Sequence, residues 1–232
     1  MKLEFLLAII PCILMAFIIY KNDKKEKEPI REIVKAFIMG MAAIFLTLFL
    51  SSVFGFDVVV VNNSSFGELI LYSFVYIALV EELSKFLFSY LFVRKNENFN
   101  YLFDGIVYFV CVSLGFALIE NLLYAVDGDL YTTLLRGFTA IPAHVFFGIT
   151  SGYYYVLYMR NKFNNKKGYR VYLLLSILFP ILLHGFYDFC ILIDHPIFTY
   201  IYVMFMVVLY YISINKIEKL KEKDDLIKKK NN

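Results

Sequence analysis

Seven apolar segments, each about 18 to 25 residues long, dominate the sequence. An α-helix needs about 20 apolar residues to cross the roughly 30 Å hydrocarbon core of a bilayer, so each segment can make one crossing. The strands of a membrane β-barrel would be shorter and would alternate in polarity. The sequence therefore predicts an all-α polytopic membrane protein, a bundle of about seven transmembrane helices, at 3–20, 36–56, 69–93, 102–126, 134–158, 171–193 and 197–215.

The basic residues between these segments are distributed unevenly. All but three of the 23 lysines and arginines lie at 21–35, 94–101, 160–170 and after residue 215, and the other connections contain none. Because basic residues concentrate on the cytoplasmic side of a membrane, we expect the N-terminus outside and the C-terminus in the cytoplasm. The first segment has no small-residue cleavage site, so we expect a retained span. Asp104 should mark the cytoplasmic end of the fourth span.

The predicted organisation is one transmembrane domain over 1–215, with its core at 69–193, followed by a charged cytoplasmic tail at 216–232. The net charge of +3 is too small to favour a nucleic-acid partner. The lipid bilayer is therefore the predicted surrounding of this chain.

Four of the seven segments carry ionisable side chains well inside their apolar runs. A charged side chain at the centre of a bilayer costs about 2.5 to 3.5 kcal/mol on insertion scales, so such residues need partners or a function. These residues, with one adjacent amide, are Glu81, Glu82 and Lys85 in the third segment, Glu120 and Asn121 in the fourth, His144 in the fifth, and His184 and Asp188 in the sixth.

Spacing and depth predict that these side chains meet. Glu81 and Lys85 are four residues apart and share a helix face, and so do His184 and Asp188. Small residues four positions apart around His144 form a seam along which another helix can approach closely. Counted from the outer end of each span at 1.5 Å per residue, the acids and imidazoles lie roughly 9 to 18 Å below the outer surface. We therefore expect one polar cluster in the outer half of the bilayer.

The charges of this cluster predict a cation. The carboxylates of Glu81, Glu82 and Glu120 exceed the positive charge of Lys85 by two, and a divalent metal ion, zinc by its usual ligands, would neutralise this excess. Two imidazoles with carboxylate oxygens are a common zinc ligand set, so we expect Glu120, His144 and His184 to hold the metal. A neighbouring carboxylate, Glu81 or Glu82, would serve as general base. Lys85 would hold the other glutamate or stabilise a developing negative charge.

Two prolines predict room in the same region. Pro142 precedes His144 by two residues, and Pro180 precedes His184 by four. A proline inside a helix removes one backbone hydrogen bond, so both helices should kink and open a wet cavity.

Other functions use the same residue types. Acids and imidazoles inside a membrane can form the relay of a proton-coupled or ion-coupled transporter, or they can only clasp the helices of a sensor or scaffold. The two halves of the chain show no internal repeat, which counts against a transporter built from repeats.

The motifs resemble those of the PrsW family of bacterial intramembrane proteases, distant relatives of the CAAX-processing membrane endopeptidases. The similarity covers about 69–193. The family's third motif commonly reads HAxxSG, whereas His144 is followed here by Val145. The matching blocks are Glu81-Glu82-Leu83-Ser84-Lys85 (EExxK), Phe116-Ala117-Leu118-Ile119-Glu120-Asn121 (FxxxEN), Ala143-His144 with Gly148, Ser151, Gly152 and Tyr153, His184-Gly185-Phe186-Tyr187-Asp188, and the lead-in Phe103-Asp104-Gly105-Ile106-Val107-Tyr108.

This resemblance implies a protease of the bacterial plasma membrane. It would make the first, site-1, cut in a membrane-anchored anti-sigma factor on the extracytoplasmic side, so that a second protease can release the sigma factor in a stress response. Asn121 and Asp188 would support the catalytic groups. A metal-free mechanism, in which Glu81 activates water and the histidines bind the oxyanion, stays open beside the metal-dependent one.

Overall fold

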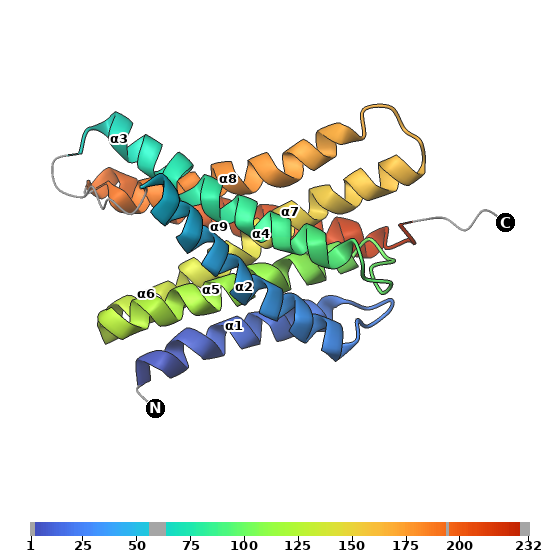
Figure 1. Cartoon of the computed structure of the whole chain (residues 1–232), viewed down its shortest axis with the longest axis horizontal. Coiled ribbons are helices and arrows are strands. Elements are labelled where there is room, and N and C mark those ends of the chain that lie inside the picture. Colours follow the sequence, from blue (N-terminus) through green and yellow to red (C-terminus); the bar gives the residue numbers. More distant parts are fainter. Residues whose placement is uncertain (1–2, 56–63, 194, 228–232) are drawn as a thin grey trace.

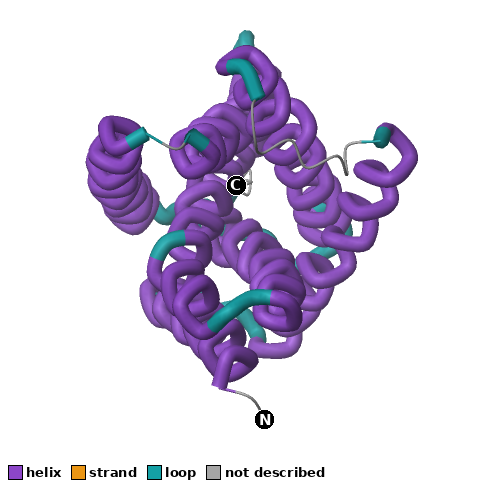
Figure 2. The backbone as a smooth tube through the Cα atoms, turned by 90° about the vertical axis from the view of Figure 1, so that its left-hand side faces the viewer, coloured by secondary structure: helices purple, strands orange, loops and turns teal. Residues whose placement is uncertain are grey.

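The computed structural model describes residues 3–55, 64–193 and 195–227, and its elements are almost entirely helical (Figure 1). Figure 2, turned by 90°, looks along many of the helices and shows them packed side by side as a bundle. The predicted all-α fold is confirmed. In chain order the elements are α1 (Leu3–Asn22), α2 (Ile30–Phe54), α3 (Phe66–Leu71), the π-helix η1 (Tyr72–Leu79), α4 (Val80–Val93), α5 (Asp104–Asp127), α6 (Leu130–Phe138), α7 (Ala140–Phe163), α8 (Arg170–Leu192) and α9 (Pro196–Glu222).

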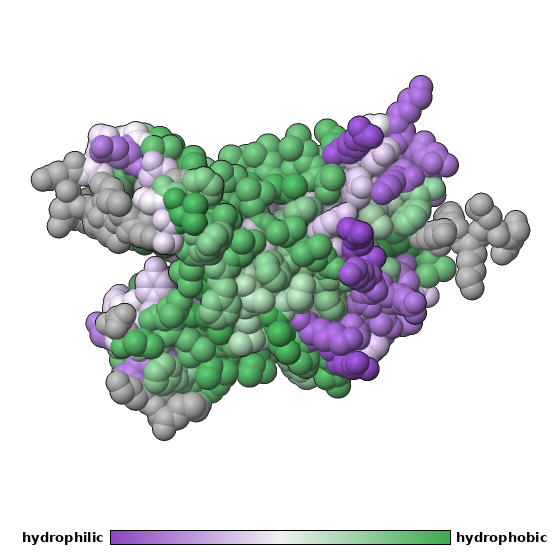
Figure 3. All heavy atoms as spheres, in the orientation of Figure 1, coloured by the Kyte–Doolittle hydropathy of each residue, from purple (hydrophilic) through white to green (hydrophobic). Residues whose placement is uncertain are grey.

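The outer surface of the bundle suits a membrane. Helices α1, α2, α5, α8 and α9 are long and apolar enough to span one. The segments α3, η1 and α4 form one further helical run over 66–93, and α7 is 24 residues long. In Figure 3 a hydrophobic middle is flanked by hydrophilic residues, most densely at the right-hand end of the view. The connections after α1, α4 and α7 lie at that same end (Figure 1).

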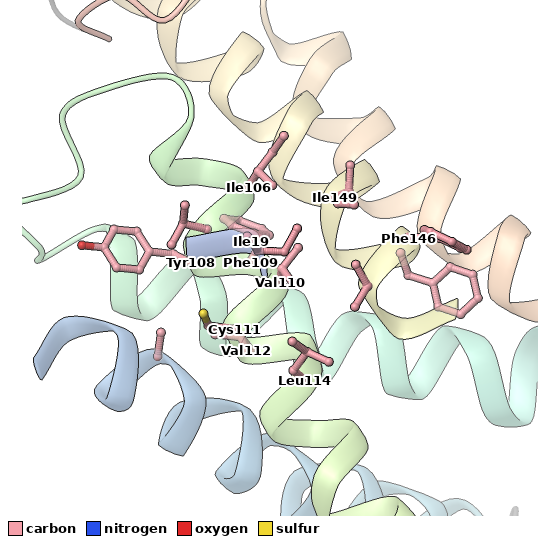
Figure 4. Packing of buried hydrophobic residues seen from close by; sticks show 14 of the residues in the cluster. Ile19, Ile106, Tyr108, Phe109, Val110, Cys111, Val112, Leu114, Phe146 and Ile149 are labelled. Atoms are coloured by element: carbon pink, nitrogen blue, oxygen red, sulfur yellow. The ribbon is translucent and has the colours of Figure 1, made fainter. Parts of the chain in front are cut away.

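Helix α5 is the central helix, and it packs against α1, α2 and α7. Figure 4 shows its buried apolar side chains beside residues from α1 and α7. The predicted small-residue seam faces this helix. A Cβ atom at Gly152 would collide with the backbone of Gly105, and one at Gly148 would lie 3.0 Å from the Cα atom of Val110. The seam therefore lets the backbones of α5 and α7 approach closely.

The predicted span at 134–158 is divided in the structure, which corrects the expected kink at Pro142. The chain forms α6, turns at Thr139 and begins α7 at Ala140. Pro142 is consequently in the first turn of α7, where the missing N–H costs nothing. A continuous helix would have brought the proline ring against the carbonyl of Phe138, so the break relieves that clash.

Pro180 does lie inside its helix, as predicted. It cannot donate a hydrogen bond to the carbonyl of Ser176, four residues earlier. The hydroxyl of Ser151, from α7, donates to that carbonyl at 2.8 Å instead. The neighbouring helix thus satisfies the backbone group that the proline leaves free, as a membrane interior requires.

Asp104 is the first residue of α5, where the sequence predicted a helix end. Its Oδ2 atom accepts hydrogen bonds from the backbone N–H groups of Asn100, at 2.8 Å, and Tyr101, at 2.6 Å. Helix α9 continues beyond 215, and the following residues return to this loop. The N–H of Leu102 donates to the carbonyl of Asp225 at 3.2 Å, and the N–H of Ile227 to the carbonyl of Asn100 at 2.7 Å. The division at 215 stays a prediction.

Candidate active site

The structure brings the predicted site residues together from four elements. Helix α4 carries Glu81, Glu82 and Lys85 directly after the π-helix, and α5, α7 and α8 supply the other side chains. Their contacts form one connected network of acids, imidazoles and cations. The roles assigned to these residues stay predictions.

Lys85 lies at the centre of this network. Its Nζ atom is 2.5 Å from Glu82 Oε1, 3.4 Å from Glu81 Oε2 and 3.3 Å from His144 Nδ1. It also lies 4.5 Å from the centre of the Phe116 ring, a favourable cation–π position. The residue is only 4% exposed. A buried ammonium group is tolerated here because carboxylates surround it.

His184 joins the two glutamates to α8. Its Nδ1 atom is 2.8 Å from Glu82 Oε1, and its Nε2 atom is 3.3 Å from Asp188 Oδ2 and 3.9 Å from Glu81 Oε2. The imidazole stacks on Phe147, with ring centroids 4.9 Å apart. Both ring nitrogens therefore face carboxylates, and the ring plane is fixed by packing.

His144 and Glu120 form a second pair of an imidazole and a carboxylate. His144 Nε2 is 2.9 Å from Glu120 Oε2, and the rings of His144 and His184 have centroids 5.7 Å apart. Within the described residues, the seven predicted acids, imidazoles and lysine thus share one buried region.

Arg136 is a site residue to which the sequence analysis assigned no role. Its Nη2 atom donates to Glu120 Oε1 at 2.6 Å, its Nε atom donates to Asn121 Oδ1 at 2.7 Å, and its guanidinium lies 3.7 Å from the Tyr124 ring centre. The signal was a lone arginine in an apolar segment, which needs a carboxylate partner. Asn121 orients Arg136, and Arg136 holds Glu120.

These side chains surround a cavity of about 290 Å³ between α2, η1, α4 and helices α5 to α8. Glu82 and Lys85 stand behind the cavity wall, at a separate small void. A larger cavity of about 960 Å³ lies between α4, α7 and the tail, and its lining mixes aromatic, aliphatic, asparagine and basic residues. Among the described residues neither an acid nor a histidine lines it. The polar residues that line the smaller cavity are Glu81, Glu120, Arg136, His144, His184 and Asp188, with Thr47 and three tyrosines.

The site fits a metal ion in the chemistry of its donors. Two imidazoles and three carboxylates face one cavity, and this donor set suits a divalent metal ion. The predicted trio Glu120, His144 and His184 is not preassembled, however. Among the described residues, donors from three side chains approach within 4.8 Å of one another at a different place, near Asp104. In the active site each imidazole is instead paired with a carboxylate.

The geometry suits water activation inside a membrane. A carboxylate that lines a cavity can accept a proton from water, while buried cations and imidazoles beside it can stabilise negative charge. The chain provides these groups on helices, with their positions fixed by mutual contacts.

Comparison with known proteins identifies the family. Residues 28–213 match the model described as PrsW family intramembrane metalloprotease. Protease PrsW of Clostridioides difficile is 37% identical over 94% of this chain and 92% of the relative. The PrsW proteases of Geobacillus kaustophilus and Bacillus subtilis are 32% and 30% identical, over 87% and 91% of this chain and 85% and 92% of the relatives. No solved structure matches the chain. With the predicted resemblance confirmed, the chain belongs to the PrsW family and is an intramembrane protease.

Proposed function

We propose that this protease hydrolyses a peptide bond of a membrane-anchored anti-sigma factor, with Glu81 as the general base. The observation that carries this proposal is the different placement of the two adjacent glutamates. Glu81 lines the cavity, whereas Glu82 stands behind it, bound by Lys85 and His184. Glu81 can therefore deprotonate a water molecule in the cavity, while Glu82 and Lys85 position the catalytic groups.

The same placement gives each histidine a task. Glu82 fixes the orientation of His184 through Nδ1, so that Nε2 is directed toward Glu81 and Asp188. Glu120, held by Arg136, faces Nε2 of His144, while Lys85 faces Nδ1 of the same ring. The protein thus orients both imidazoles before substrate arrives, which lowers the reorganisation needed during the reaction.

We further propose that Glu120, His144 and His184 hold a divalent metal ion, zinc by the nature of the donors, with Asp188 as a supporting carboxylate. When bound, zinc supplies a Lewis acid that polarises the scissile carbonyl and acidifies water. The imidazoles and carboxylates that line the cavity and the family description as a metalloprotease support this proposal.

The depth of the site supports a cut near the outer face. Glu120 follows Asp104 by 16 residues on α5, which is about 24 Å at 1.5 Å per residue. Helix α5 begins at Asp104, directly after the connection that follows α4, and that connection lies at the end of the bundle with the other basic connections (Figure 1). By the positive-inside rule this is the cytoplasmic end. The site is therefore nearer the opposite end, where a site-1 cut of an anti-sigma factor takes place.

Cleavage can be tested with purified protein in proteoliposomes, using single-span anti-sigma factors from the source genome tagged at both ends. We expect cleavage by the wild type and by the exposed control Glu97→Gln. Glu81→Gln should lose activity by at least 100-fold at unchanged abundance, as removal of a general base does. Full activity of Glu81→Gln would refute its assignment as the base.

Metal dependence requires a separate measurement, the zinc content of the purified wild type and of the His144→Ala, His184→Ala double variant. Stoichiometric zinc in the wild type and none in the variant would support the metal site. Negligible zinc in both, with cleavage intact in chelator, would leave the metal-free glutamate mechanism.

A further inference from the structure

A second polar cluster lies far from the active site, where the connection between α1 and α2 meets the start of α5. Its members are Asp23, Glu28 and Asp104, which are 1%, 3% and 0% exposed. One carboxylate oxygen of each lies within 4.8 Å of the other two. Glu120 is separated from Asp104 by about 24 Å of helix α5, so the two sites are distinct.

The buried oxygens of this cluster lack partners. Neither carboxylate oxygen of Asp23 accepts a hydrogen bond within the described residues, and the same holds for Asp104 Oδ1. The other oxygen of Asp104 is engaged by two backbone N–H groups, so the carboxylate cannot turn away freely. Glu28 accepts a hydrogen bond from the hydroxyl group of Tyr108. Buried carboxylate oxygens without donors are costly, and they indicate a missing positive group.

The nearby lysines do not supply that positive group. Lys25 donates to the backbone carbonyl of Asp224, and Lys27 donates to the carbonyls of Tyr20 and Lys21. The carboxylate of Asp224 instead adds negative charge: burial and repulsion from Asp224 raise the pKa of Asp23 to about 6. Within the described part of the chain, the ammonium groups of Lys25 and Lys27 thus bind backbone carbonyls and do not pair with the carboxylates of the cluster.

We propose that Asp23, Glu28 and Asp104 bind one hard divalent cation, of the class of Mg²⁺, Mn²⁺ or Ca²⁺. The donors are all carboxylate oxygens, which these ions prefer, and neither an imidazole nor a thiolate belongs to the cluster. Bound there, the ion joins the connection between α1 and α2 to the first residue of α5.

This site stabilises the cytoplasmic end of the bundle and takes no part in hydrolysis. The loop that precedes Asp104 also binds the tail, because the N–H of Phe103 donates to Asp224 Oδ1 at 3.0 Å. The cation therefore strengthens a junction of three chain segments that are distant in sequence.

The test is Mn²⁺ binding to the purified full-length protein in detergent at pH 7.5, followed by electron paramagnetic resonance. The His144→Ala, His184→Ala background removes the histidine donors of the active site. In it we expect one Mn²⁺ per chain, displaced by excess Mg²⁺ or Ca²⁺. Asp23→Asn should weaken binding at least tenfold, whereas Glu26→Gln, an exposed acid in the same connection, should leave it unchanged. No side chain among the described residues donates a hydrogen bond to Asp23, so its replacement breaks no such bond.

A thermal measurement supplies the second readout. Mn²⁺ should raise the melting temperature of the background protein and of Glu26→Gln but not of Asp23→Asn. No bound Mn²⁺ in the background protein, or equal binding by Asp23→Asn, would overturn the proposal. The proposal is also overturned if, without metal, Asp23→Asn melts at a higher temperature than the background protein and Mn²⁺ leaves the melting temperature of the background protein unchanged. In that case a proton shared by Glu28 and Asp104 takes the place of the cation. If Asp23→Asn does not accumulate, Glu28→Gln tests the same loss.

Discussion

Arg136 provides the sharpest energetic test of the active-site geometry. It reaches Glu120 and Asn121 at 2.6 and 2.7 Å and lies over the ring of Tyr124. Hydrogen bonds to charged groups contribute about 1.5–3 kcal/mol each, and a cation–π contact adds about 0.5–1 kcal/mol. Arg136→Gln removes these contacts and leaves Glu120 paired with His144 alone.

The expected magnitude follows from burial. Breaking a buried ion pair by removing one partner costs about 3–5 kcal/mol, because the other charge stays buried. The side chains of Arg136 and Glu120 are 19% and 18% exposed, so water screens part of this cost. We expect Arg136→Gln to lower the free energy of unfolding by about 3 kcal/mol. The double variant with Glu120→Gln should recover about 2 kcal/mol, because it leaves no unpaired charge.

The assay is reversible unfolding in mixed micelles by SDS titration, in chelator so that metal binding does not contribute. The four proteins of the cycle are compared with Arg31→Gln, which removes an exposed arginine on α2 and should change stability by less than about 0.5 kcal/mol. If the effects of Arg136→Gln and Glu120→Gln add within about 0.5 kcal/mol, the two residues do not act as a pair and the reasoning fails.

Three further predictions concern the scaffold. Gly152→Ala should lower the free energy of unfolding by about 1–3 kcal/mol, because the added Cβ atom collides with the Gly105 backbone. The control is Gly67→Ala, whose Cβ atom enters open space, and SDS titration measures the stability of both variants. Ser151→Ala should lower the free energy of unfolding by about 1–3 kcal/mol, because it leaves the Ser176 carbonyl without a hydrogen bond. The same titration compares it with Ser52→Ala, and equal stability of the two variants would contradict the role of the Ser151 hydroxyl. Truncation after Glu222 should speed hydrogen exchange at Leu102 and Phe103, while truncation after Ile227 should not, because only the former removes their acceptors.

The sequence predicted the helical architecture and the members of the acid and histidine cluster. Both follow from the cost of exposing polar groups to lipid, which forces helices on the backbone and partners on intramembrane charges. The pairing within the cluster did not follow. Spacing indicated Glu81 and Lys85 as a pair, but the shortest contact of Lys85 is to Glu82, because the position of α8 brings His184 to the same carboxylate.

Long-range contacts limited the prediction elsewhere. Asp23 and Glu28 lie in a basic connection that resembles a solvated surface, yet both are buried. Nearby, Lys25 is bound by Asp224, 199 residues later. The break at Thr139 is local, but it depends on whether Pro142 lies inside a helix or at its start. The apolar residues continue across both positions, so the sequence pattern did not distinguish one helix from two.

The π-helix η1 has a consequence for helical periodicity in this region. Residues 66–93 form one rod, but over Tyr72–Leu79 the backbone closes i→i+5 bonds in place of i→i+4 bonds. One extra residue in a turn shifts the angular phase of everything after it by about 100°. A helical wheel drawn with a single period from Phe66 to Val93 therefore misplaces the residues after Leu79 relative to those before Tyr72. The face that carries Glu81 and Lys85 is found only when the phase is counted anew from Val80.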